Sequence, residues 1–234
     1  MPEKNYPHHI AIILDGNRRF AKRLNLDPWK GHEWGRKKFE KLVDWCKEFN
    51  IKELTLYTFS VQNFNRPKKE FDFLMDLFRD AAKKLLKDQR VDEMGMKIRY
   101  VGRTEMFPKD IQDFMHEIEE KTKNNNKYFL NFAMGYGGKE EITDAIKSIA
   151  KKISSGELKA KDINEKIIEE NLYLASEPDL IIRTGGEKRT SNFLMWQSAY
   201  SEWIFLDKAW PEFEKEDFIE CLEEYSKRER RLGK

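Results

Sequence analysis

Short apolar runs alternate with longer amphipathic segments along most of the chain, and this alternation limits the possible folds more than any other feature. The first run, residues 9–14, is continuously apolar after its histidine, which is typical of a parallel strand buried on both faces. Residues 31–50 follow with apolar side chains at three- and four-residue spacing, the pattern of a helix with one buried face. Strands that alternate with helices predict a mostly parallel sheet flanked by helices.

The alternation continues to the end of the chain. We predict further strands at residues 51–59, 96–101, 128–134, 179–183 and 203–206, and further helices at residues 67–87, 109–121, 139–153, 163–172 and 215–231. Because no repeat or linker interrupts the sequence, we expect residues 1–234 to form one α/β domain with a sheet of about six strands. Ligands of such sheets bind outside the carboxyl ends of the strands, so the segments after the strands are the candidates for chemistry.

Composition excludes several classes of protein. The chain has 44 Lys and Arg against 42 Asp and Glu, and this balance argues against a dedicated nucleic-acid binder. Cys46 and Cys221 lie far apart and form no metal or redox motif, and lone thiols favour a reducing, cytoplasmic setting. No apolar run approaches the roughly 18 residues of a membrane span. We therefore expect a soluble protein, which would still be free to lie against a membrane surface.

The segment after the first predicted strand combines charges of both signs. In Asp15-Gly16-Asn17-Arg18-Arg19, a carboxylate, a glycine and an amide precede two guanidinium groups where a helix is expected to begin. Backbone amides at a helix start and arginines both suit a phosphate. The carboxylate would repel that anion unless a cation such as Mg²⁺ bridged the two. A capping aspartate followed by a solvated basic turn is the structural alternative.

Two further loops at predicted strand ends are rich in hydrogen-bond donors. Residues 60–67 form a loop long enough to move over an anion, and residues 183–192 contain two glycines that allow close backbone approach. The candidate anion ligands are Ser60, Asn63 and Arg66 in the first loop and Arg183, Lys188, Arg189 and Ser191 in the second. A capped turn and a solvated basic loop, respectively, are the structural alternatives.

Two single residues complete the candidate site. His32 lies near the start of the helix after the first loop, although a lone histidine is more often structural. Glu202 follows the 183–192 loop by ten residues and is a possible metal ligand, with a surface position as the alternative. Neither a GxxxxGK[ST] sequence nor a GxGxxG at a helix start is present, which disfavours the common nucleotide enzymes. Donor-rich loops, one acidic position and an apolar helix face nearby would suit a diphosphate on a long hydrocarbon.

In this order and at these intervals, the motifs resemble the cis-prenyltransferases, the undecaprenyl diphosphate synthase family. The likeness extends from His9 to Gly233. It rests on residues 9–19, 31–32, 54–60, 63–67, 136–138, 179–186, 189–193, 196–197, 199–200, 202 and 228–231. The Asp-Gly-Asn-Arg-Arg form and Trp45-Cys46 are closer to archaeal members, which often prefer longer primers such as geranylgeranyl diphosphate.

The resemblance implies a homodimeric, Mg²⁺-dependent transferase. Such an enzyme adds isopentenyl diphosphate units, with cis geometry, to an allylic diphosphate such as farnesyl or geranylgeranyl diphosphate. Its product would be a long-chain polyprenyl diphosphate, the precursor of a carrier lipid of the undecaprenol or dolichol type for glycan synthesis. The growing chain would need an apolar tunnel, with the helix at residues 71–86 as its expected wall. We expect a cytoplasmic protein with peripheral membrane contact through its lipid product.

By position, the resemblance also assigns roles to individual residues. It implies Asp15 and Asn63 as catalytic residues, and Asp15 and Glu202 as metal ligands. Contacts to the allylic diphosphate would come from Gly16, Asn17, Arg18, Arg19, His32, Ser60 and Arg66. Contacts to isopentenyl diphosphate would come from Arg183, Arg189 and Ser191. The 60–66 loop would close over the substrates, and the C-terminal Arg231-Leu232-Gly233 would reach across the dimer interface.

The chain departs from the bacterial pattern of the family at four positions. They are Pro28 in place of an arginine, Lys188 in place of a histidine, Gln62 in place of a loop glutamate and Phe64 in place of a tryptophan. The contact missing at Pro28 is either lost or supplied by Lys30. Lys188 leaves in doubt one contact near the second metal site.

Three other activities fit the sequence less well. A non-catalytic partner subunit of the same family would lack the aspartate and the substrate arginines, which are present here. A trans-prenyltransferase would need DDxxD motifs, and the chain has no Asp-Asp pair. A phosphatase with Asp15 as nucleophile would want a second acid two residues later, where Asn17 stands.

Overall fold

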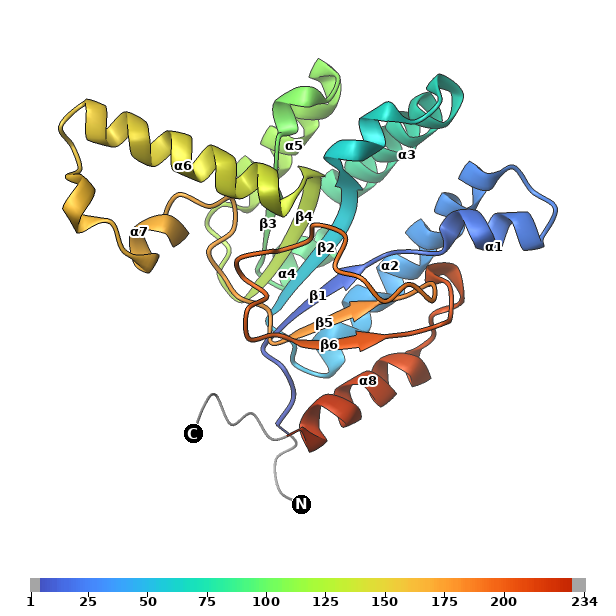
Figure 1. The fold of residues 1–234 in the computed structure, drawn as a ribbon. Helices are drawn as coiled ribbons and strands as arrows, with labels where there is room; N and C mark the ends of the chain where they lie inside the picture. The colour runs from blue at the N-terminus through green and yellow to red at the C-terminus, as the bar shows by residue number, and fades with distance from the viewer. Residues whose placement is uncertain (1–4, 229–234) are drawn as a thin grey trace.

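The six strands form one sheet in which every neighbouring pair is parallel, in the order β3-β4-β2-β1-β5-β6 (Figure 1). This computed structural model describes residues 5–228. The strands are β1 His9–Ile13, β2 Glu53–Ser60, β3 Met96–Val101, β4 Tyr128–Tyr136, β5 Leu180–Arg183 and β6 Glu202–Phe205. The predicted α/β fold with six strands is confirmed, and the sheet is entirely parallel rather than mostly so.

Eight α-helices are found in the described part of the chain. They are α1 Asn17–Arg23, α2 Gly31–Glu48, α3 Lys68–Lys87, α4 Gln89–Glu93, α5 Lys109–Thr122, α6 Gly138–Ser154, α7 Glu165–Glu169 and α8 Lys215–Lys227. Two 3-10 turns, η1 Pro28–Lys30 and η2 Val61–Asn65, precede α2 and α3.

Two helix predictions need correction, and one helix was missed. The helix predicted at 163–172 is only α7, because Asn164 caps its start by accepting a hydrogen bond from the Ile167 amide and Asn171 donates to the Ile167 carbonyl at its end. The short helix α4 was not predicted; Asp88 takes an extended backbone conformation after α3 and caps α4 through the Arg90 amide. The last helix ends at Lys227 instead of 231, and residues 229–231 lie outside the described part.

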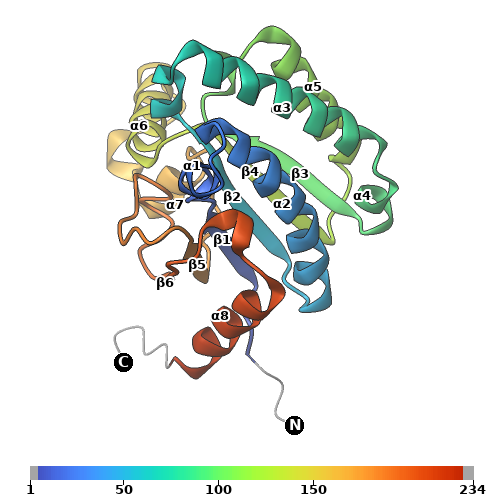
Figure 2. The same cartoon turned by 90° about the vertical axis from the view of Figure 1, so that its right-hand side faces the viewer.

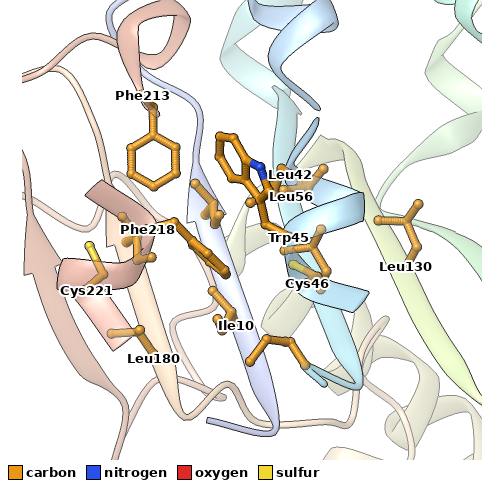
Figure 3. Close-up of a cluster of buried hydrophobic side chains, with 14 of the residues drawn as sticks. Ile10, Leu42, Trp45, Cys46, Leu56, Leu130, Leu180, Phe213, Phe218 and Cys221 are labelled. Atoms are coloured by element: carbon orange, nitrogen blue, oxygen red, sulfur yellow. The ribbon is translucent and has the colours of Figure 1, made fainter. Parts of the chain in front are cut away.

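Both faces of β1 are buried, as its continuous apolar run predicted. Ile10 and Ile12 pack on one face with the side chains of α2 and α8. Figure 3 shows this layer, with Trp45 of α2 facing Phe218 of α8. Ala11 and the other side chains of β1 that point to the opposite face of the sheet pack against the 170–200 segment. The thiols of Cys46 and Cys221 lie in the first layer, and burial raises the pKa of both, to about 12 for Cys221.

A third apolar cluster lies between α3, α5 and the carboxyl ends of β2 and β4. Phe59, at the end of β2, is its centre and contacts the rings of four other phenylalanines, which are Phe64, Phe71, Phe78 and Phe107. Figure 2 shows α2 and α3 on the same side of the sheet, with α4 beyond the end of α3. This cluster and α2 enclose the cavity described next.

Candidate active site

The carboxyl ends of β2, β1 and β5 bring the three predicted loops together. β1 lies between the other two strands, and Ile13 is level with Tyr57 on one side and Arg183 on the other. Asp15 therefore follows β1 beside the loop that begins at Ser60 and beside Arg183. Figure 1 shows α1 starting from this edge of the sheet. The expected position of the site, outside the carboxyl ends of the strands, matches this arrangement.

Arg183 connects the first and third loops. Its guanidinium Nη2 donates to the Asp15 Oδ2 at 2.9 Å, and Nη1 donates to the Ser191 Oγ at 2.6 Å and to the Arg189 carbonyl. The residue is only 4% exposed, so its charge depends on these partners. The Arg183 guanidinium offsets the negative charge of Asp15, which would otherwise repel an anionic ligand beside it.

Arg19 lies near the same carboxylate, whereas Arg189 pairs with a different one. Arg19, in the first turn of α1, approaches the Asp15 Oδ2 to 3.4 Å and Glu187 to 3.5 Å. Arg189 pairs with Glu187 at 2.5 Å and is largely exposed. Arg189 meets Arg183 through its backbone, because its carbonyl accepts a hydrogen bond from the Arg183 guanidinium.

The backbone of the first loop requires a glycine. Gly16 caps α1 with a φ of 99°, a left-handed conformation that residues with a Cβ adopt at a cost. A Cβ at this position would also lie 2.7 Å from the Ala209 Cβ. The free amides at the start of α1 are thus placed beside Asp15, where they can donate to an anion.

Glu70 joins the first and second loops. It is almost fully buried in the first turn of α3 and forms ion pairs with Arg66 and, at 3.8 Å, with Arg18. The second loop is also ordered from within, since the Ser60 amide donates to the Asn63 side chain at 3.0 Å. The predicted residues of both loops therefore share one side of the cavity mouth.

His32 is uncharged at physiological pH. Burial, and to a smaller extent the nearby charges of Arg66 and Arg18, lower the pKa of its imidazole to about 3. A neutral imidazole can still donate one hydrogen bond to an anion.

A cavity of about 400 Å³ opens beside these residues, and its lining includes Asp15, Asn17, His32, Ser60, Asn63, Arg66 and Arg183. Of the other predicted ligands, Arg18, Arg19, Arg189 and Ser191 are not part of the lining. Asp15, Asn17 and Arg183 line its polar end. Further in, the lining is mainly apolar, and α3 contributes Leu74, Leu77, Phe78, Ala81 and Leu85. The helix expected to form the tunnel wall does line this cavity.

Four buried polar atoms of the cavity lining have no hydrogen-bond partner among the described residues. They are the Asn17 Oδ1, the His32 Nε2, the Arg36 Nε and the Arg183 Nε. Unpaired buried polar atoms are costly and therefore uncommon, so their concentration here indicates a site for a polar ligand. Arg36 was missed in the sequence; it lies four residues after His32, on the same face of α2.

Comparison with known proteins identifies the family. The family model Prenyltransf, described as "putative undecaprenyl diphosphate synthase", matches residues 13–233. The chain belongs to this family. It is 49% identical over 230 residues to a tritrans,polycis-undecaprenyl-diphosphate synthase (geranylgeranyl-diphosphate specific) of Pyrococcus furiosus, covering 97% of this chain and 87% of the relative. It is 44% identical over 234 residues to the protein of the same name from Methanocaldococcus jannaschii, covering 98% and 84%.

Two solved structures share the fold. A lavandulyl diphosphate synthase of Lavandula x intermedia, in complex with dimethylallyl diphosphate, superposes with a TM-score of 0.94 at 33% identity, over 99% of this chain and 100% of that one. A structure described as a probable undecaprenyl diphosphate synthase from Campylobacter jejuni gives a TM-score of 0.81 at 32% identity, over 98% of this chain and 100% of that one. The predicted resemblance to the cis-prenyltransferases is confirmed.

Glu202 does not lie beside Asp15 in this protein. It begins β6 level with Leu180, and Phe205 is the residue level with Arg183. At about 3.3 Å per residue, Glu202 lies roughly 10 Å back along the strand. Its carboxylate pairs with Arg228 of the C-terminal segment. A metal role for Glu202 remains a prediction, and the predicted contact of residues 231–233 lies outside the described residues.

The possible metal ligands at the mouth of the cavity suit a cation that is bound by the protein and a substrate together. No group of three or more His, Cys, Asp or Glu side chains that could hold a metal occurs in residues 5–228. Mg²⁺ is commonly bound by one or two carboxylates together with substrate phosphates and water. Asp15, with an amide-rich helix start beside it, fits that arrangement. None of the helices in the same residues is long and apolar enough to cross a membrane.

Proposed function

We propose that this protein is a cis-prenyltransferase that extends an allylic diphosphate with isopentenyl diphosphate. The observation that carries the proposal is the cavity itself, in which unpaired polar atoms and arginines at the mouth lead into an apolar interior. A ligand with a charged head and a long hydrocarbon tail satisfies both ends. The lavandulyl relative, which holds an allylic diphosphate in the same fold, supports this choice.

In this proposal the allylic diphosphate binds at the start of α1. The amides after Gly16, together with Asn17, Arg18, Arg19 and the neutral His32, hold its phosphate oxygens, and its tail enters the cavity. Asp15 binds Mg²⁺, which when bound neutralises charge that develops on the departing pyrophosphate. Arg183 then has two roles, since it orients Asp15 and it faces the second diphosphate beside Ser191.

The reaction requires the two substrates to be held close together without water. The allylic carbon–oxygen bond breaks, the isopentenyl double bond forms the new carbon–carbon bond, and a proton is lost from the isopentenyl unit. Arginines placed before the reaction stabilise the growing charge on the leaving group. We infer that Ser60, Asn63 and Arg66 close over the substrates, because water would otherwise capture the allylic cation.

The names of the archaeal relatives favour geranylgeranyl diphosphate over farnesyl diphosphate as the primer. We further propose a long-chain polyprenyl product that serves as a carrier-lipid precursor, and a homodimer in which the C-terminal residues complete the isopentenyl diphosphate site. Cytoplasmic location with peripheral membrane contact follows from such a product.

Incubation with Mg²⁺, labelled isopentenyl diphosphate and a series of primers from C10 to C20 tests the proposal. We expect release of pyrophosphate and elongated products, with geranylgeranyl diphosphate as the best primer. Absence of product with every primer would refute the enzyme assignment. Light scattering at a series of protein concentrations tests the homodimer.

The Asp15→Ala variant tests the metal role separately. Turnover should fall by roughly two to three orders of magnitude, the range seen when a single transition-state contact is removed. The circular dichroism spectrum should stay the same, because the Asp15 side chain is at the cavity mouth and not in the apolar layers. Near-normal turnover would exclude Asp15 as the metal-binding carboxylate. Asp113→Ala is a matched control, because that exposed carboxylate pairs with Lys109 on the surface of α5 and is not part of the cavity lining.

A further inference from the structure

Glu140, in the first turn of α6, lies between two of the loops that form the active site. Its Oε1 accepts a hydrogen bond from the Gln62 Nε2 at 3.2 Å, and its Oε2 accepts one from the Asn192 Nδ2 at 2.8 Å. Gln62 belongs to the 60–66 loop, and Asn192 directly follows Ser191 in the 183–192 loop. Figure 1 shows the start of α6 (yellow) beside the orange segment that follows β5. One carboxylate therefore connects two loops that are remote in sequence.

Asn192 is held against this turn of α6 by both its backbone and its side chain. Its carbonyl accepts from the Gly138 amide at 2.7 Å, and its Oδ1 accepts from the Lys139 amide at 2.8 Å. A Cβ on Gly137 would lie 2.2 Å from the Glu140 Oε2 and 2.7 Å from the Asn192 Nδ2. Only a glycine at this position leaves room for the contact between the carboxylate and the amide.

The backbone of the 183–192 loop is strained where this contact is made. The φ angle is 51° at Ser191 and 63° at Asn192, a left-handed conformation that is unfavourable for residues with a Cβ. Such a conformation persists only where surrounding contacts hold it. The Ser191 Oγ accepts from the Arg183 guanidinium at 2.6 Å, and it is a predicted contact to isopentenyl diphosphate. The hold of α6 on Asn192 therefore sets the position of the Ser191 hydroxyl.

The contact with Gln62 connects the other loop to the same carboxylate. Gln62 lies in the single turn η2, which is closed by the hydrogen bond from the Ser60 amide to the Asn63 side chain. Because η2 is one short turn, a movement of Ser60 and Asn63 carries Gln62 with it. Opening of the 60–66 loop thus removes one of the two hydrogen bonds that fix the Glu140 side chain.

We propose that Glu140 is a positioning residue that makes the isopentenyl diphosphate site depend on closure of the 60–66 loop. The proposal rests on the proposed elongation activity. With the loop closed, Gln62 holds the Glu140 carboxylate toward Asn192, and Ser191 stays in its strained position. With the loop open, the Glu140 side chain regains rotational freedom and Ser191 is held less firmly. Isopentenyl diphosphate therefore binds best after the loop has closed, and by linkage its binding favours the closed loop.

Exchange of donor and acceptor tests the contact with Asn192. Asn192→Asp places two carboxylates against each other, so the KM for isopentenyl diphosphate should rise by about tenfold. The KM for the allylic diphosphate should change by less than about twofold. In Asn192→Asp/Glu140→Gln the new amide donates to the new carboxylate, while the carbonyl of the new glutamine still accepts from Gln62. This double variant should return the KM for isopentenyl diphosphate to within about twofold of the wild-type value.

A second set of variants tests the connection to the other loop. Gln62 is exposed, so Gln62→Ala leaves the apolar layers intact, and it should raise the KM for isopentenyl diphosphate by about threefold or more. Glu140→Ala should raise it at least as much. Gln62→Ala/Glu140→Ala should be no worse than Glu140→Ala, because both single changes remove the same hydrogen bond.

Glu120→Ala is the matched control. Glu120 pairs with Lys123 at 2.6 Å on the surface of α5 and is not part of the cavity lining. Both KM values of this variant should equal those of the wild type.

An unchanged KM for isopentenyl diphosphate in Asn192→Asp and in Gln62→Ala would overturn the proposal. Equal increases in both KM values would also overturn it, because they would indicate general damage to the site. Failure of the exchange variant to restore the KM would refute the contact with Asn192, and additive effects of Gln62→Ala and Glu140→Ala would show that Gln62 does not act through Glu140. Absence of any product from the wild-type protein would refute the proposed function instead, so the two failures are distinguishable.

Discussion

The buried neutral imidazole of His32 predicts a specific loss of stability in acid. Its pKa is lowered from 6.5 to about 3 in the folded protein, chiefly by burial. Between these two values the unfolded chain binds a proton that the folded protein does not, so the free energy of unfolding falls as the pH falls below 6.5. The contribution is negligible at pH 7.5 and reaches about 2 kcal/mol at pH 5.0.

Replacement by glutamine isolates this contribution. His32→Gln keeps a polar side chain of similar size but removes the titration. We expect the wild type to lose about 2 kcal/mol more than the variant between pH 7.5 and pH 5.0. Urea unfolding followed by tryptophan fluorescence measures the difference, at one protein concentration because association would shift both curves.

All other titrating groups are common to the two proteins, including His9, whose pKa is also lowered by burial. Equal losses in the wild type and in His32→Gln would refute the burial of a neutral imidazole. Inorganic pyrophosphate provides a second check. An anion bound beside His32 favours its protonated form, so saturating pyrophosphate should reduce the difference between the two proteins.

Three further substitutions test the site and the cavity wall. Lys30→Ala should raise the KM for the allylic substrate severalfold if this lysine replaces the arginine absent at Pro28; an unchanged KM would remove that role. Arg36→Met should weaken pyrophosphate binding by about tenfold or more, since hydrogen bonds to charged groups contribute about 1.5–3 kcal/mol. Calorimetry measures the affinity, and equal affinities of variant and wild type would show that the unpaired Nε faces no ligand. Phe59→Ala should lower the free energy of unfolding by about 3–5 kcal/mol, whereas a urea midpoint near that of the wild type would contradict the central place of this ring.

The strands were predictable because each contains a short run rich in apolar residues, although only β1 and β5 are buried at every position and the edge strands β3 and β6 are partly exposed. β3 was predicted with its observed bounds, and the others within two residues at each end. The errors concern short helices. α4 depends on a capping contact of Asp88, and α7 ends where the side chain of Asn171 turns back to the backbone. Hydrophobic periodicity carries no information about such local hydrogen bonds.

The candidate site was only partly visible in the sequence. Asp15, Ser60 and Arg183 lie at the carboxyl ends of strands that neighbour one another in the sheet, so a general rule for parallel sheets was enough to group them. Arg36 and Glu70 lie inside amphipathic helices, where a charged residue is ordinarily a solvated one. Their participation depends on how α2 and α3 approach the loops.

The sequence by itself determined the parallel α/β fold, the three loops at the strand ends and the family, because these follow from apolar periodicity and from motifs that are local in the chain. The tertiary structure decided which polar atoms are left unpaired in the cavity, that burial keeps His32 neutral, that Glu202 lies away from Asp15, and that Glu70 pairs with Arg18 and Arg66. Each of these depends on distances between segments that are remote in sequence, and burial then sets the cost of every unpaired or charged group.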